Sequence, residues 1–275
     1  MPACRARNDP RNAEPWPARR RLARWIGGLV VAGAWPVLAQ DRAPDKVCTV
    51  ARPTRPPPGP ASNPPPVAAF IDRARSALSM PTAYWLGHGG WLAGEPFQDR
   101  PGRPIDLARE LARLQVARPR VHALYLAGLR ESGLDLATLP PVACDCSGFI
   151  CWALGVARDR SALAIPGGWI NTDSMHADAL GPRRLFEPLE RAVPGALLVY
   201  PKPDPRDPEG EPGHVAIVTD VDDAGRAVGL LHCAPCNLVL DPPDGLPRNA
   251  IAITDTQLFD GQPATRVVMW KGFAR

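Results

Sequence analysis

Apolar residues recur with a helical period in the first half of the chain. Their spacing at i, i+3, i+4, i+7 and i+11 predicts an amphipathic helix over 67–78, which Pro81 ends because proline cannot continue a helix. Two further helical patterns lie between 104 and 133, the first after a candidate cap at Asp106 and the second ending at Gly133. The first half of the chain is therefore expected to be mainly helical.

The second half has short runs rich in β-branched and apolar residues, separated by clusters of Pro, Gly and Asp. These five predicted strands cover 196–200, 215–221, 228–232, 251–253 and 267–270. Helices first and strands afterwards predict an α+β fold, with N-terminal helices packed on a mainly antiparallel β-sheet.

The second and third predicted strands are joined by a candidate hairpin loop, Asp223-Ala224-Gly225, in which Gly225 takes the left-handed position. In that register Ala216 faces His232. His214 and His232 then lie on one face of the sheet, diagonally adjacent, with about 5–8 Å between their Cβ atoms. A slip of one residue would place the two histidines on opposite faces.

A short helix is predicted between the capping residue Asp145 and the glycine Gly155. It places Cys146 at a helix N-terminus, where free amides and the helix dipole favour the nucleophilic thiolate. With His214 as a base and His232 to orient it, Cys146 completes a triad for acyl transfer. The other histidines are expected at non-catalytic positions, His88 and His176 as solvated loop residues on segments that could border the cleft and His122 on a helix.

These segments together resemble the NlpC/P60 family of papain-like cysteine peptidases. The likeness lies in Asp-Cys-Ser-Gly-Phe at 145–149, Gly-His-Val-Ala-Ile at 213–217 and a histidine that ends the next strand. Tyr-Trp-Leu-Gly at 84–87 is similar to the family's Tyr-x-x-Gly segment, and Pro-Gly-Ala-Leu-Leu-Val at 194–199 is similar to its Pro-Gly-Asp-Leu-Val segment. The similarity covers roughly residues 67–240.

The resemblance implies a papain-like fold and a peptidoglycan endopeptidase, which cuts peptide bonds in stem peptides, commonly between D-glutamate and a diamino acid. Cys146 would be the nucleophile, His214 the general base and His232 its orienting partner. The substrate-binding residues beside the cleft would be Tyr84, Asp145 and Ser147. Peptidoglycan peptides would be the partner of a monomer that needs no metal and no cofactor.

This sequence departs from the family pattern in three ways. About fifty residues separate the Tyr84 segment from Cys146, so 91–140 is expected to be an added helical insertion that narrows the substrate range. Ala196 stands where the family usually has Asp, and the additional cysteines are atypical.

The cysteines and histidines also allow a second chemistry. Cys144, Cys146, His232, Cys233 and Cys236 have spacings found in zinc sites, so a zinc-stabilised domain is one alternative. Export and the proline inside the Cys-x-x-Cys segment favour a disulfide or a redox pair there instead. The other alternative is a non-catalytic wall-binding module of the same fold.

The N-terminal region has the pattern of an export signal. An arginine cluster precedes an apolar run that is shorter than the ~20 residues of a membrane span and ends in small residues at Ala39. We therefore expect a signal peptide at 1–39, a proline-rich linker at 40–66 and a catalytic domain at 67–275. The protein would be periplasmic or extracellular, without a membrane span after signal cleavage.

Charge excludes one class of partner. Of the formal net charge of +4, residues 1–39 contribute seven arginines against Asp9 and Glu14, so the remainder of the chain is close to neutral. A nucleic-acid partner requires a concentrated basic surface to displace counterions from phosphates, and the folded part supplies none in sequence.

Overall fold

The computed structural model describes residues 66–90, 95–131, 133–158, 170–181, 183, 185–206, 211–239 and 248–273. The signal peptide predicted at 1–39 and, apart from Pro66, the linker predicted at 40–66 lie outside these residues. Within the described ranges, no helix is both long and apolar enough to cross a bilayer.

The predicted helices are confirmed. They are α2 (Val67–Ser76) with the 3₁₀ turn η2 (Ala77–Ser79), α3 (Leu107–Ala117), α4 (Pro119–Glu131) and α5 (Cys146–Leu154). The Asp106 side chain accepts a hydrogen bond from the Arg109 amide, so the expected cap of α3 is present. The sequence pattern missed α6 (Thr172–Leu180) and the short turns η3 (Leu136–Thr138) and η4 (Pro235–Val239). Helix α6 has little helical periodicity and begins at a capping box formed by Asn171 and Ser174.

The strands form one large and one small sheet. The large sheet has the order β4-β9-β5-β6-β7-β8, and every neighbouring pair is antiparallel. Its strands are β4 (Phe186–Pro188), β5 (Leu197–Tyr200), β6 (His214–Val221), β7 (Ala227–Cys233), β8 (Ile251–Thr254) and β9 (Arg266–Trp270). All five predicted strands are in it. The small sheet, which the sequence pattern missed, has the order β1-β3-β2 and consists of β1 (Ala83–Tyr84), β2 (Arg103–Pro104) and β3 (Val142–Cys144).

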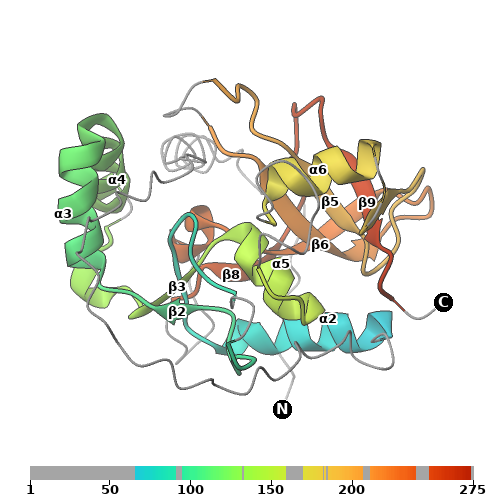
Figure 1. Cartoon of the computed structure of the whole chain (residues 1–275), viewed down its shortest axis with the longest axis horizontal. Coiled ribbons are helices and arrows are strands. Elements are labelled where there is room, and N and C mark those ends of the chain that lie inside the picture. The colour runs from blue at the N-terminus through green and yellow to red at the C-terminus, as the bar shows by residue number, and fades with distance from the viewer. Residues whose placement is uncertain are drawn as a thin grey trace, which may run out of the picture.

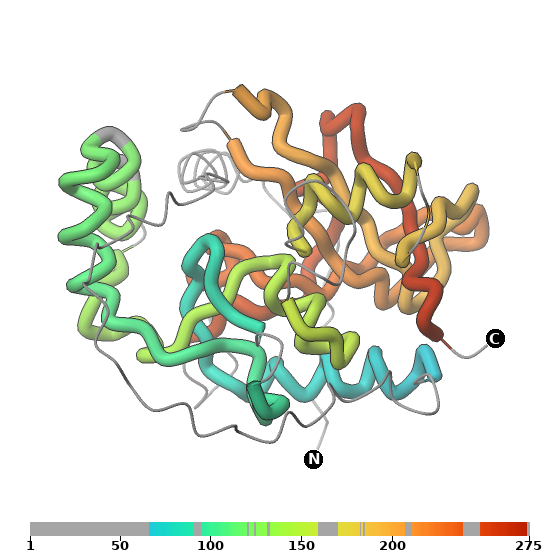
Figure 2. Tube along the Cα trace, in the orientation of Figure 1, coloured from blue at the N-terminus to red at the C-terminus, as the bar shows by residue number. Residues whose placement is uncertain are grey.

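Helix α5 lies at the centre of the molecule, between α2 and the large sheet, where it packs on β6 and β7 (Figure 1). The α3–α4 pair stands apart from the large sheet, on the side of the small sheet (Figure 2). Its apolar face contributes Leu111 and Tyr125 to the main core, and Tyr125 makes an edge-on ring contact with Trp85 just after β1. The chain is therefore an α+β protein, and the helices expected within 91–140 are present.

The large sheet separates two apolar clusters, because successive side chains of a strand point to opposite faces. Ile217 and Leu231 belong to the main core, together with α5. Val218 and Leu230 belong to a second cluster that includes Phe259, from the loop after β8. This division decides which functional side chains lie on the same side of the sheet.

Candidate active site

The start of α5 is built as the sequence predicts. The Asp145 carboxylate accepts a hydrogen bond from the Gly148 amide at 2.6 Å, which satisfies a backbone donor that the first turn leaves free. The helix ends at Gly155, whose φ of 73° is the left-handed conformation that glycine adopts readily. Cys146 is therefore the first residue of α5.

An arginine that the sequence analysis missed holds this helix start. Arg158 forms an ion pair with Asp145 at 2.8 Å, and both side chains are 2% exposed. Its guanidinium also donates to the Ser147 hydroxyl at 2.7 Å and to the His88 carbonyl at 3.1 Å. An ion pair of this kind is recognised only from the positions of its partners in space, so an arginine four residues after the end of α5 gives no signal in the sequence.

Asp145 and Ser147 are both buried. Asp145 also accepts a hydrogen bond from the Gly87 amide at 2.7 Å, which ties the β1 segment to the start of α5. These contacts position the backbone around Cys146. The substrate-binding role expected for the two residues stays a prediction.

The hairpin register predicted for β6 and β7 is confirmed. Ile217 pairs with Leu231 and Val218 with Leu230, and the Asp222 amide bonds to the Arg226 carbonyl across the loop. An irregularity near Asp220 shifts the pairing by one residue, and the pairing returns to register before the loop. In the loop, Gly225 has a φ of 73°.

His214 and His232 meet as this register requires. His214 Nε2 lies 2.8 Å from His232 Nδ1, and the two ring centroids are 5.0 Å apart. His232 Nε2 in turn lies 2.9 Å from the Thr254 hydroxyl on β8. Thr254 is a second residue that the sequence analysis missed, because the long connection between β7 and β8 hides the register of the two strands.

The two imidazoles are held in an apolar and aromatic environment. The Tyr200 and Phe259 rings lie 6.4 Å and 5.6 Å from the His214 ring, centroid to centroid. Burial, and after it the charge of His232, lowers the pKa of His214 well below its ordinary 6.5. Burial alone lowers the pKa of His232 to about 4. Both rings are therefore neutral at neutral pH.

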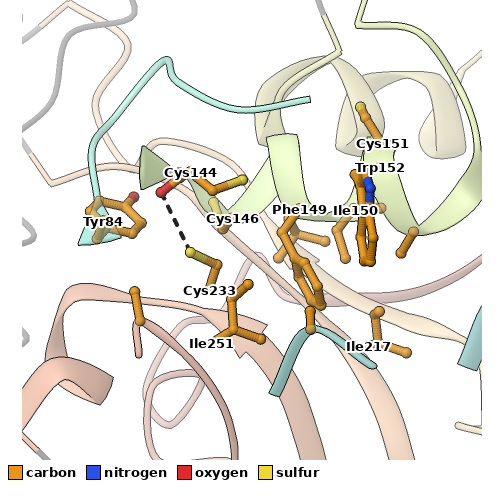
Figure 3. Packing of buried hydrophobic residues seen from close by; sticks show 14 of the residues in the cluster. Tyr84, Cys144, Cys146, Phe149, Ile150, Cys151, Trp152, Ile217, Cys233 and Ile251 are labelled. Carbon is orange, nitrogen blue, oxygen red and sulfur yellow. Dashed lines mark hydrogen bonds between the residues drawn. The ribbon is translucent and has the colours of Figure 1, made fainter. Parts of the chain in front are cut away.

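The Cys146 thiol is buried among Tyr84, Cys144 and Cys233 (Figure 3). Burial, reinforced by the Asp145 carboxylate, raises the pKa of Cys146 to about 12, while hydrogen bonding to the Val215 and Ser147 backbones lowers it by less. The thiolate expected at the helix N-terminus is thus wrong for this structure, because desolvation outweighs the helix dipole. Tyr84 is buried beside the thiol, and burial raises its own pKa well above 10.

The structure brings the two histidines together but does not hydrogen-bond them to the thiol. Among the described residues, Cys146 makes no hydrogen bond to either imidazole, and it belongs to the main core on the α5 side of the sheet. His214 pairs with Tyr200, a member of the second cluster, and contacts Phe259 there. Val215, one residue after His214, lies close enough for its backbone to lower the pKa of the Cys146 thiol by less than burial raises it.

Among the residues that the structure describes, no disulfide involves Cys144, Cys151 or Cys233. The disulfide favoured for the Cys-x-x-Cys segment, Cys233 to Cys236, is therefore not formed. The described residues include no cluster of three or more His, Cys, Asp or Glu side chains placed to hold a metal ion, which leaves the zinc alternative without structural support.

The other histidines lie outside this arrangement. His176 is in α6 and not on a loop, and its Nε2 lies 2.9 Å from the Ala264 carbonyl oxygen. His88 is on the loop after β1, with Nε2 3.3 Å from the Pro104 carbonyl oxygen, and His122 is in α4 as expected.

No family model, curated protein or solved structure matches this chain.

Proposed function

We propose that this protein is an exported cysteine hydrolase, similar to the NlpC/P60 family and papain-like in fold, that cleaves peptide bonds in peptidoglycan stem peptides. Cys146 is the nucleophile, His214 the general base and His232 the residue that orients the base. The observation that carries the proposal is the 2.8 Å contact between His214 Nε2 and His232 Nδ1, which gives the expected base the orienting partner that the mechanism requires.

In the resting site the Cys146 thiol and the His214 imidazole are both expected to be neutral. Since burial raises the pKa of Cys146 and lowers the pKa of His214, a preformed thiolate–imidazolium pair is not the resting state. The thiol proton therefore passes to His214 as the sulfur attacks the carbonyl carbon, which is general-base catalysis. His232 supports the imidazolium that forms by accepting from its Nε2–H.

The start of α5 supplies the other requirement of acyl transfer. The carbonyl oxygen becomes an oxyanion as the carbon–sulfur bond forms, and the first-turn amides of a helix are donors of the right kind for it. His214 then gives its proton to the leaving amine, and water releases the acyl group from Cys146. For this cycle the thiol has to reach His214 Nδ1 when substrate is bound.

Digestion of purified peptidoglycan tests the proposal. The full chain should release new stem-peptide fragments, identified by mass, and Cys146→Ala should release none. Cys151→Ala is the matched control, because Cys151 is another buried thiol of α5 and takes no part in the proposed chemistry. Equal product release by Cys146→Ala and wild type would overturn the proposed mechanism.

A second candidate function is a non-catalytic wall-binding module of the same fold. It is favoured by the buried Cys146 thiol, which is hydrogen-bonded to neither imidazole among the described residues. Such a module would co-sediment with peptidoglycan equally well as wild type and as Cys146→Ala, and neither would release fragments.

A further inference from the structure

Three side chains and one carbonyl form a continuous row across strands β6, β7 and β8. His214 Nε2 contacts His232 Nδ1 at 2.8 Å, and His232 Nε2 contacts Thr254 Oγ1 at 2.9 Å. The Thr254 hydroxyl then donates to the Asp255 backbone carbonyl at 2.9 Å. The row ends there, on an oxygen that can only accept.

The sheet places these residues on one face. His232 pairs directly with Ala252, and Thr254 is two positions further along β8, so its side chain lies diagonally next to His232. His214 is diagonal to His232 on the other side, through the confirmed β6–β7 register. The small side chain of Ala252, opposite His232, leaves room for this diagonal contact.

The Asp255 carbonyl at the end of the row determines which atom is the donor in each hydrogen bond of the row. A threonine hydroxyl has one hydrogen, and here the Asp255 carbonyl takes it. The hydroxyl oxygen can then only accept, so the hydrogen of the next contact is on His232 Nε2. A neutral imidazole carries one N–H, which leaves His232 Nδ1 as an acceptor for the His214 Nε2–H.

We infer that Thr254 is a positioning residue that selects the tautomers of both histidines and leaves His214 Nδ1 unprotonated. Only the catalytic consequence of this inference rests on the proposed function, in which His214 Nδ1 is the atom that takes the proton from Cys146. Reversal of the row would place a hydrogen on His214 Nδ1 and remove the base. Burial of His232, which is 1% exposed, keeps water from replacing the Thr254 hydroxyl at low cost.

The tautomers are measured directly on the full chain by long-range ¹H–¹⁵N correlation spectra of protein with ¹⁵N-labelled histidine. Protonated and unprotonated ring nitrogens have well-separated shifts, and substitution of the three other histidines, His88, His122 and His176, assigns the remaining signals. We expect the Nε2–H tautomer for both His214 and His232. A wild-type His232 or His214 that carries its hydrogen on Nδ1 overturns the inference, whatever the variants do.

Two variants test the role of the hydroxyl. Thr254→Val keeps the shape and removes the hydroxyl, so both rings should become tautomer mixtures and kcat/KM on wall peptides should fall roughly tenfold. Thr254→Ser keeps the hydroxyl and should restore the wild-type tautomers. Thr219→Val is the matched control, because that hydroxyl of the same sheet bonds to the Asp220 carboxylate and lies outside the row.

The two proposals fail separately. Wild-type tautomers in a folded Thr254→Val protein overturn the role of Thr254 and leave the hydrolase proposal intact. The opposite outcome is also possible to distinguish. If Thr254→Val disturbs tautomers that are fixed in the wild type, the role of Thr254 is supported. If the wild type then releases no wall fragments, the hydrolase proposal is wrong.

Discussion

Asp145 connects three segments of the chain at the residue scale. Its carboxylate accepts from the Gly87 amide in the loop after β1, from the Gly148 amide in α5 and from the Arg158 guanidinium. A buried charge is tolerated only when such partners replace its water, and here every partner belongs to the protein. The position of Cys146 therefore depends on groups that do not react.

Removal of Arg158 tests this dependence. Arg158→Met leaves a buried, unpaired carboxylate, so the free energy of unfolding should fall by about 3–5 kcal/mol. Urea unfolding at pH 7 measures the loss. Arg113→Met is the matched control, because the Arg113–Glu110 pair is exposed on α3 and should contribute under about 1 kcal/mol. A similar small loss for both variants would contradict the structural role of Arg158.

The two buried histidines should make stability depend on pH. An unfolded histidine takes up its proton below about pH 6.5, whereas burial holds the pKa of His232 at about 4 and that of His214 well below 6.5. As the pH falls from 6.5 to 4 the unfolded state binds more protons, so the free energy of unfolding decreases, by up to about 1.4 kcal/mol per pH unit for each histidine.

Urea unfolding at pH 7, 6 and 5 measures this slope. His232→Gln removes one of the two titrating rings and should flatten the curve. His122→Gln, a change on α4 away from the pair, should leave the slope as in wild type. A wild-type midpoint that does not move between pH 7 and pH 5 would show that the rings are not buried as neutral groups.

At the scale of elements, the parts that were predictable have local causes. The β6–β7 register follows from one loop, Asp223-Ala224-Gly225, and from the alternation of side chains along two adjacent strands. The start and end of α5 follow from Asp145 and Gly155. Each of these signals lies within a few residues of the structure it determines.

The parts that were missed have causes far apart in the chain. Strands β1, β2 and β3 are two or three residues long and exist because distant segments meet, with Ala83 and Arg103 both pairing with Ala143. Thr254 contacts His232 across a long connection whose length hides the register. The buried face of helix α6 includes the polar residues Thr172, Ser174 and Asp178, and Leu180 is exposed, so the helix lacks the apolar periodicity that identifies a surface helix.

Two glycines in the loop after β1 allow a matched test of how closely this loop packs against Cys144. Gly87 and Gly89 both have positive φ, 74° and 85°, but a Cβ on Gly87 would meet open space, whereas one on Gly89 would overlap the Cys144 sulfur. Gly87→Ala should cost about 1–2 kcal/mol of stability through φ alone. Gly89→Ala should cost about 1–3 kcal/mol more, because Cys144 has to move.

Urea unfolding of the two variants gives the difference. The displacement of Cys144 should also disturb the adjacent Asp145-Cys146 start of α5, so Gly89→Ala should lose more activity on wall peptides than Gly87→Ala. Equal stabilities for the two variants would mean that the loop does not pack against Cys144 as described.

At the scale of the whole molecule, the parts of the proposed active site contact two different apolar clusters. Cys146 is on the α5 side, in the main core, and the His214–His232 pair has its ring contacts in the second cluster. Val215, whose backbone lowers the pKa of the Cys146 thiol, follows His214 at the start of β6. The proposed function therefore requires that the Cys146 thiol transfers its proton to the His214 ring.

The rate at which iodoacetamide alkylates Cys146 at pH 7 tests that proton transfer most directly, with the labelled cysteine identified by peptide mass. The proposed mechanism predicts alkylation of wild-type Cys146, a rate at least about tenfold lower in His214→Gln, and an unchanged rate in His122→Gln. If wild type and His214→Gln react at the same rate, or if Cys146 is unreactive in both, then His214 does not serve as its base and the hydrolase mechanism is wrong.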